Sequence, residues 1–133
     1  MRYLLDTNVC IHYLNQSNLL IKQKFAAVQN QDKIVCSIVR AELFYGAYKS
    51  QRRQANLASL NSFLTHLPSL AFDDASAEIY GQVRAELAQR GAPIGHHDLQ
   101  IAAIALANHL TVVTHNVSEF SRVPNLLWED WEV

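Results

Sequence analysis

The most constraining feature of the sequence is a short apolar segment, residues 3–5, that is followed at once by an acid, Asp6. Three consecutive apolar residues indicate a short buried strand, and from Thr7 onward the apolar residues recur at helical spacing. This stretch predicts a strand, a tight turn and a helix, with Asp6 in the turn. Because ligand sites of open α/β sheets lie just beyond the carboxyl ends of strands, Asp6 occupies a position where chemistry is expected.

The alternation of short apolar segments with helical patterns continues along the chain. Further strands are predicted at residues 33–36, 70–72, 111–114 and, at an edge, 126–128. Further helices are predicted at residues 19–30, 38–48, about 57–67 and 96–108, and Ser37 is the expected N-cap of the helix at 38–48. A long helix is predicted from Asp73 or Asp74 to about residue 90, and a short helical piece after the strand 111–114 ends at residue 120. This order predicts an α/β fold of three layers, with helices flanking both faces of a short central parallel β-sheet.

Length and composition exclude several classes of protein. The 133 residues, half of them apolar, fit one domain spanning residues 1–133. The net charge of -1 does not indicate a nucleic-acid binder, although a local basic patch is compatible with it. No apolar stretch reaches the ~18 residues that a membrane span needs. Cys10 and Cys36 lie in apolar segments, which favours buried free thiols in a reduced, cytoplasmic protein over a disulfide.

Glu42 is an acid on a helix face that is otherwise apolar. Its neighbours three and four positions away are Ile38, Val39, Tyr45 and Gly46, and none is charged. A buried carboxylate is costly unless it is paired or bound to a metal. Glu42 is therefore either a metal ligand or an acid at the rim of the core that reaches water or an arginine.

Three more polar side chains are expected near the same edge of the sheet. Asp98 lies in the first turn of an almost uncharged helix, where an acid also caps the helix dipole. Asn116 follows a predicted strand, as Asp6 does, but Asn is also a common turn residue or N-cap. Glu119 could be its capping-box partner. Each of these residues, taken alone, has a structural explanation. However, the elements that carry them are all expected to converge at the same edge of the sheet.

Three carboxylates and an amide oxygen form a donor set for a hard divalent cation. Mg²⁺ and Mn²⁺ prefer oxygen ligands and retain bound waters. Clustered acids repel one another, and a cation relieves that repulsion. Such a cation can orient and activate a water for in-line attack on a phosphodiester and stabilise charge on the leaving oxygen.

Several segments in order along nearly the whole chain carry a family resemblance. They are Leu5–Asn8, Ala41–Ala47, Pro93–Gly95 leading to Asp98 and Ile101–Ala103, and Thr114–Asn116 with Glu119 and Phe120. With these motifs the chain resembles PIN-domain ribonucleases of the VapC toxin type. The resemblance implies a single PIN domain, an endoribonuclease dependent on Mg²⁺ or Mn²⁺, a homodimer, and inhibition by a small VapB-like antitoxin that covers the active site. It also implies that Asp6, Glu42 and Asp98 bind the metal.

One departure from the family pattern concerns Asn116, where many PIN domains have a fourth acid. An asparagine can ligate through its carbonyl or through a water, but it carries no charge, and Glu119 is a candidate to substitute for the acid. The residues therefore support a first metal ion better than a second. Similar toxins include enzymes that cut initiator tRNA, which makes tRNA a candidate substrate by resemblance.

RNA must be held by its phosphates, and positive candidates are few. Lys49, Arg52 and Arg53 form the densest basic cluster, which is either an RNA contact or a solvated linker. His96 and His97 flank the first-turn acid of their helix and either touch a phosphate or line the loop. No histidine spacing in the sequence resembles a zinc site.

Two other functions are compatible with the sequence. One is a phosphatase that uses Asp6 as covalent nucleophile, but such enzymes commonly have a second acid where this chain has Asn8. The other is a PIN-like module that binds RNA or protein without cutting it. The intact trio Asp6, Glu42 and Asp98 argues against a binding module, whereas Asn116 leaves it open.

Overall fold

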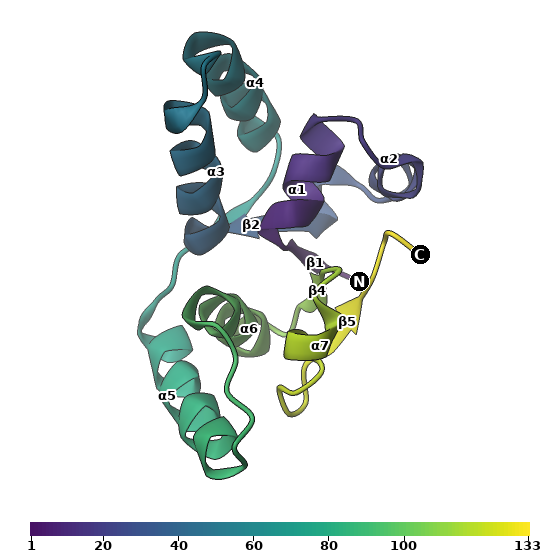
Figure 1. Cartoon of the computed structure of the whole chain (residues 1–133). Helices are drawn as coiled ribbons and strands as arrows, with labels where there is room; N and C mark the ends of the chain where they lie inside the picture. Colours follow the sequence, from purple (N-terminus) through teal and green to yellow (C-terminus); the bar gives the residue numbers. More distant parts are fainter.

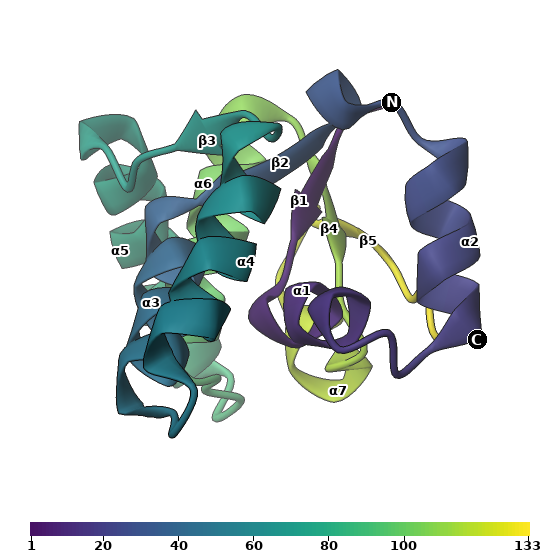
Figure 2. The same cartoon turned by 90° about the horizontal axis from the view of Figure 1, so that it is seen from above.

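The centre of the protein is a sheet of five short parallel strands in the order β3-β2-β1-β4-β5. Figure 1 labels four of them, and β3 is labelled in Figure 2. The computed structural model describes all of residues 1–133. The strands are β1 (Tyr3–Leu5), β2 (Lys33–Cys36), β3 (Ser69–Leu70), β4 (Thr111–Val113) and β5 (Leu127–Glu129). Because β1 lies between β2 and β4, the residues that follow these three strands meet at one edge of the sheet.

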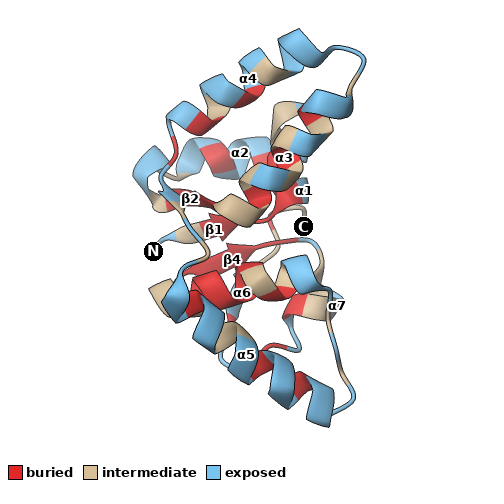
Figure 3. Cartoon of the chain, turned by 90° about the vertical axis from the view of Figure 1, so that its left-hand side faces the viewer, coloured by how far each residue is buried: buried red, intermediate tan, exposed pale blue.

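Helices cover both faces of the sheet, which confirms the predicted α/β/α arrangement. They are α1 (Thr7–Leu14), α2 (Leu19–Ala27), α3 (Ser37–Lys49), α4 (Arg53–Thr65), α5 (Asp74–Gln89), α6 (His96–Asn108) and α7 (Val117–Phe120), with a 3-10 turn η1 (Asn30–Asp32). Helices α1 to α4 lie on one side of the sheet, and α5 and α6 lie on the other (Figure 3). Seen from above, α1 lies between α2 and the paired helices α3 and α4 (Figure 2).

The core is built from the central strands and α6. Leu4, Leu5 and Val112 are fully buried. Residues 101–105 of α6 are all buried, because this helix packs against strand β4 on one side and against α5 on the other. A helix that is apolar on nearly every side is expected to be buried in this way, so the prediction for residues 96–108 is confirmed.

One predicted helix cap is wrong. Helix α3 begins at Ser37 itself, with Cys36 in the N-cap position. The hydroxyl of Ser37 instead accepts a hydrogen bond from the backbone N–H of Phe72 at 3.2 Å. That bond ties α3 to the segment after β3, and β3 covers only Ser69–Leu70 instead of the predicted residues 70–72.

The acidic C-terminal segment is anchored to the body of the protein. Strand β5 pairs with β4, and the Trp131 side chain that follows is 1% exposed. Its ring packs edge-on against Tyr3 and Phe25, with centroid distances of 5.2 and 5.8 Å. The indole N–H donates to Oε1 of Glu129 at 3.1 Å. The residues on either side of Trp131 are therefore held in fixed positions.

Both cysteines are buried free thiols, as predicted. Burial raises the pKa of the Cys10 and Cys36 thiols, so neither is a reactive thiolate. None of the helices has the length and apolar character needed to cross a membrane.

Candidate active site

Asp6 is buried where β1 ends, and two hydrogen bonds fix its carboxylate. The backbone N–H of Thr7 donates to Oδ1 at 2.8 Å, which makes Asp6 the N-cap of α1. The hydroxyl of Thr114, just after β4, donates to Oδ2 at 2.8 Å. The same hydroxyl accepts from the backbone N–H of Asn116 at 2.9 Å. Asp6 thus joins the ends of two neighbouring strands.

Asp98 and Glu119 meet around the side chain of Asn116. The amide nitrogen of Asn116 donates to Oδ2 of Asp98 at 2.8 Å and to Oε2 of Glu119 at 3.0 Å. Glu119 also accepts from the backbone N–H of Gly95 at 3.4 Å, just before α6. The amide nitrogen of Asn116, and not its carbonyl oxygen, therefore faces the acids of α6 and α7.

Glu42 lies on α3 at the rim of the core, where its side chain is 33% exposed. Its Oε1 is 2.8 Å from Nδ1 of His97, so the carboxylate has a partner. The other histidine of this turn, His96, places its Nδ1 3.2 Å from the Tyr80 hydroxyl. Glu42 and residues 95–98 line an open pocket of about 400 Å³. Glu42 thus lies at the rim of the core with His97, and not an arginine, as its partner, and it lines the same pocket as Asp98, where it can still bind a metal.

The acids at this edge outnumber their basic neighbours. His97 pairs with Glu42, and the charge of Arg122 acts on Glu119, but neither Asp6 nor Asp98 has a basic partner. Burial raises the pKa of Asp6, and the charges of Glu42 and Glu119 add to the effect, while the Thr114 and Thr7 hydrogen bonds oppose it. Burial also raises the pKa of Asp98 to about 8, with further contributions from Glu119 and Asp6. The pKa of Glu119 is lowered chiefly by its hydrogen bond with Asp98. This group of carboxyls favours a bound cation.

The donor set fits a hard cation that keeps part of its water shell. The ligand atoms of another group, His115, Asp130 and Glu132, all lie within 4.8 Å of one another. The ligand atoms of Asp6, Glu42 and Asp98 are spread more widely than this. Mg²⁺ usually retains several waters, so ligands at this wider spacing can reach it directly or through water. The hydroxyl oxygen of Thr7, beside Asp6, is buried without a hydrogen-bond partner, which leaves it free to bind such a water.

The predicted basic cluster lies apart from the acids. Lys49, Arg52 and Arg53 are exposed at the far end of the α3–α4 pair, away from the sheet (Figure 1). Lys49 is seven residues beyond Glu42 on α3, which corresponds to about 10 Å along the helix. The structure therefore brings together Asp6, Glu42, Asp98, Asn116 and Glu119, with His97 at Glu42, and leaves the basic cluster outside this group.

A family model described as PIN domain matches residues 3–126. The chain belongs to the PIN domain family. Curated relatives of this PIN domain include ribonuclease VapC2 of Rickettsia felis, 40% identical over 140 residues and covering 99% of each chain. The tRNA(fMet)-specific endonuclease VapC of Shigella flexneri is 40% identical over 132 residues, covering 98% of each chain.

Solved structures give the same assignment. The PIN domain resembles a chain in the crystal structure of VapBC2 from Rickettsia felis bound to a promoter DNA fragment, with a TM-score of 0.90, 38% identity and coverage of 98% and 99%. It resembles a chain of DNA-bound VapBC from Salmonella typhimurium with a TM-score of 0.92, 39% identity and 98% coverage of each chain. The predicted likeness to VapC-type PIN domains is confirmed.

Sequence reasoning about this PIN domain did not identify Thr114 as a partner of Asp6. The two residues are 108 positions apart. The parallel register pairs Leu5 with Val113, so the next residue on each strand lies at the same level. The predicted strand 111–114 included Thr114, whereas β4 ends at Val113. The available signal was a polar residue at the carboxyl end of an apolar strand.

Proposed function

We propose that this PIN domain, residues 1–133, is a metal-dependent endoribonuclease that hydrolyses phosphodiester bonds of RNA. The observation that carries the proposal is the group of acids, from three helices and one strand end, that share one edge of the sheet. Burial raises the pKa of Asp6 and of Asp98, and no ion pair links either carboxyl to a basic side chain. The full-length similarity to proteins named VapC ribonuclease supports the same reaction.

Asp6, Glu42 and Asp98 are the proposed metal ligands, with Asn116 and Glu119 nearby, and the proposed cofactor is Mg²⁺ or Mn²⁺. When bound, such a cation supplies activation of the attacking water and stabilisation of charge on the leaving oxygen. The raised pKa values of Asp6 and Asp98 fit this role. Burial is the main cause and neighbouring acids add to it, so a bound cation that replaces the lost solvation and offsets the repulsion favours the ionised carboxylates.

The surrounding residues position the acids. Thr114 and the Thr7 N–H orient the carboxylate of Asp6. The amide of Asn116 holds Asp98 and Glu119 at a fixed separation, which we propose is its role in place of direct ligation. The pocket between Glu42 and residues 95–98 is open, so a folded RNA can bring its phosphate backbone to the acids.

The proposed substrate class is tRNA, since one relative is named a tRNA(fMet)-specific endonuclease. The proposed partner is a VapB-like antitoxin, because the similar solved chains come from VapBC assemblies. We also propose a homodimer and a cytoplasmic location; the buried free thiols fit a reducing compartment.

The test is incubation of the purified protein with total tRNA and Mg²⁺, with and without EDTA. We expect cleavage that EDTA stops and that Asp6→Asn reduces roughly 100-fold or more, while circular dichroism shows an intact fold. Asp74→Asn, the same chemical change at an exposed acid on α5, is the matched control and should cleave normally. Tight RNA binding without cleavage by the wild-type protein would instead identify a binding module.

A further inference from the structure

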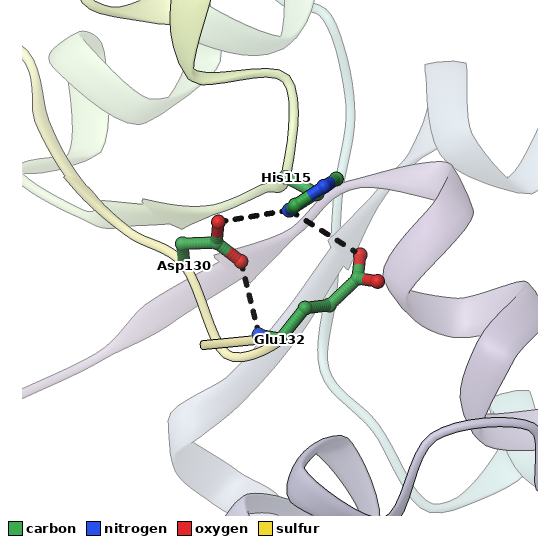
Figure 4. A group of neighbouring side chains, drawn as sticks. All are labelled: His115, Asp130 and Glu132. Atoms are coloured by element: carbon green, nitrogen blue, oxygen red, sulfur yellow. Dashed lines mark hydrogen bonds and ion pairs between the residues drawn. The ribbon is translucent and has the colours of Figure 1, made fainter.

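A second group of side chains that can bind a metal includes His115, the residue after Thr114. His115 Nδ1 is 2.8 Å from Oδ2 of Asp130 and 4.0 Å from Oε2 of Glu132 (Figure 4). The ligand atoms of these three residues all lie within 4.8 Å of one another. A fourth side chain borders the group, because Nδ1 of His12 on α1 is 3.3 Å from Oε1 of Glu132.

Two polar atoms of this group are buried without a hydrogen-bond partner. They are Oε2 of Glu132 and Nδ1 of His12, which lies 3.3 Å from Oε1 of Glu132 but makes no hydrogen bond with it. The Thr7 hydroxyl is the one other buried side-chain polar atom that lacks a hydrogen bond. A buried carboxylate oxygen without a donor is costly and calls for an explanation such as a bound ion. The Glu132 side chain is only 12% exposed, so bulk water satisfies little of it.

The two acids are held in place before any ion binds. Trp131, between them, is buried in the core, which fixes the backbone on both sides. The backbone N–H of Glu132 donates to Oδ1 of Asp130 at 2.9 Å and so orients the Asp130 carboxylate, and both carboxylates face His115 (Figure 4). The Asn18 side chain donates to Oε1 of Glu132 at 3.5 Å, which leaves Oε2 facing the imidazole. The donor atoms are therefore preorganised.

We propose that His115, Asp130 and Glu132, with His12 as a candidate fourth ligand, form a second cation site that takes a Zn²⁺-class ion. Mixed imidazole nitrogen and carboxylate oxygen donors suit Zn²⁺, whereas an all-oxygen set suits Mg²⁺. Tetrahedral Zn²⁺ with ligand distances of about 2.0–2.2 Å places its ligands roughly 3.3–3.6 Å apart, so a group spread over 4.8 Å must close by about 1 Å when the ion binds. The two carboxylates neutralise a dication when both histidines are neutral.

An ion at this position cross-links parts of the chain that are far apart in sequence. His12 lies on α1, His115 lies in the turn between β4 and α7, and the acids follow β5. The turn that carries His115 also carries Asn116, so the ion holds this turn against α1 and the C-terminal segment. We infer a structural role for the second cation, separate from the proposed reaction.

The test uses the full-length Asp98→Asn protein, in which the proposed catalytic metal site is weakened, and Zn²⁺ alone as the probe. Calorimetric titration should show one Zn²⁺ per chain, and the ¹⁵N signal of the His115 imidazole should shift with Zn²⁺ but not with Mg²⁺. Adding His115→Ala should weaken Zn²⁺ binding at least about tenfold. Glu132→Gln, which preserves size, should do the same, and Zn²⁺ should no longer raise the melting temperature of either variant.

His66→Ala, which removes an exposed histidine at the end of α4, is the matched control and should bind Zn²⁺ as before. Zn²⁺ binding that is unchanged by His115→Ala and Glu132→Gln would overturn the proposal. So would the absence of Zn²⁺ binding by the Asp98→Asn protein, which would place all metal binding at the acids of the active site. RNA cleavage with Mg²⁺ is measured separately, so failure here leaves the proposed function standing.

Discussion

Individual carboxyl groups of the candidate active site are held in states that cost the metal-free protein stability. Asp98 is half-buried among acids, and its one hydrogen bond from Asn116 does not offset the loss of solvation and the repulsion by the other acids. Groups at functional sites often show such conflicts between stability and chemistry. The clearest consequences are changes of stability with pH and with single isosteric substitutions.

Asp98→Asn should stabilise the metal-free protein at pH 7. The pKa of Asp98 is raised to about 8 in the folded protein, above its ordinary value of 3.8. The folded state therefore holds a proton that the unfolded state has lost, and stability falls as the pH rises from about 4 to about 8. Because the group is half-exposed and solvent screens its charge, we expect a gain of about 1 kcal/mol from Asn.

The measurement is urea unfolding of both proteins in EDTA at pH 5, 7 and 8.5. The wild-type curve should lose stability over this range relative to Asp98→Asn. A large loss of stability in the variant at pH 7 would show instead that Asp98 is a structural cap of α6.

Asn116→Asp should change stability and metal affinity in opposite directions. The substitution replaces the amide that donates to Asp98 and Glu119 with a third carboxylate. We expect the metal-free protein to lose about 1–3 kcal/mol, because a hydrogen-bonded bridge becomes a repulsion. Mg²⁺ affinity should rise by about tenfold, because the charge of the ligand set increases. Calorimetry with Mg²⁺ and thermal unfolding in EDTA measure the two effects, and weaker Mg²⁺ binding would contradict the account.

At the scale of secondary-structure elements, the site depends on which strand ends are neighbours. The position of Asp6 and the burial of α6 follow from local patterns, namely an apolar triplet followed by an acid and a helix apolar on nearly all sides. These features were predictable because burial selects apolar residue types at each buried position, and that selection is visible in the local sequence. The bond from Thr114 to Asp6 depends on strand order and register, which no local pattern encodes.

The C-terminal segment shows the same limit. The acids of this segment suggest a solvated tail, but the packing of Trp131 on Tyr3 and Phe25 fixes the segment against the core. The grouping of His12, His115 and Glu132 was not predictable from histidine spacing, because these ligands come from three separate elements.

Trp131→Ala should destabilise the protein strongly. The side chain is fully buried and is the anchor of the segment after β5. Truncation of a buried aromatic residue typically costs about 3–5 kcal/mol. Trp128→Ala on the exposed edge strand removes the same side chain from a site that is 38% exposed, and it should cost under about 1 kcal/mol. Guanidinium unfolding followed by circular dichroism compares the two, and equal losses would show that Trp131 is not an anchor.

At the scale of the whole molecule, negative and positive regions are separated. The acids share one edge of the sheet, whereas Lys49, Arg52 and Arg53 lie at the far end of the α3–α4 pair (Figure 1). An RNA that reaches both regions must span more than one nucleotide, so this separation favours a structured RNA over a short fragment. A solvated connection without RNA contact is the competing interpretation of the basic cluster.

Replacing Lys49, Arg52 and Arg53 by Gln distinguishes the two interpretations. In the Asp6→Asn background, which prevents cleavage, tRNA affinity should fall, and the slope of log K against log salt should decrease by about 2 if all three contact phosphates. Replacing Arg2, Lys22 and Lys24 by Gln removes the same charge elsewhere on the surface and should leave the slope nearly unchanged. Equal slopes in both triple variants would mean that the basic cluster is only a solvated connection.

The central claim is that Asp6, Glu42 and Asp98, distant in sequence, share one cation. The most direct measurement is electron paramagnetic resonance counting of bound Mn²⁺, made in the His115→Ala background so that the second site does not contribute. The account predicts one Mn²⁺ per chain, with affinity reduced at least about tenfold by each of Asp6→Asn, Glu42→Gln and Asp98→Asn. Mn²⁺ binding that is unaffected by any of the three substitutions would contradict it.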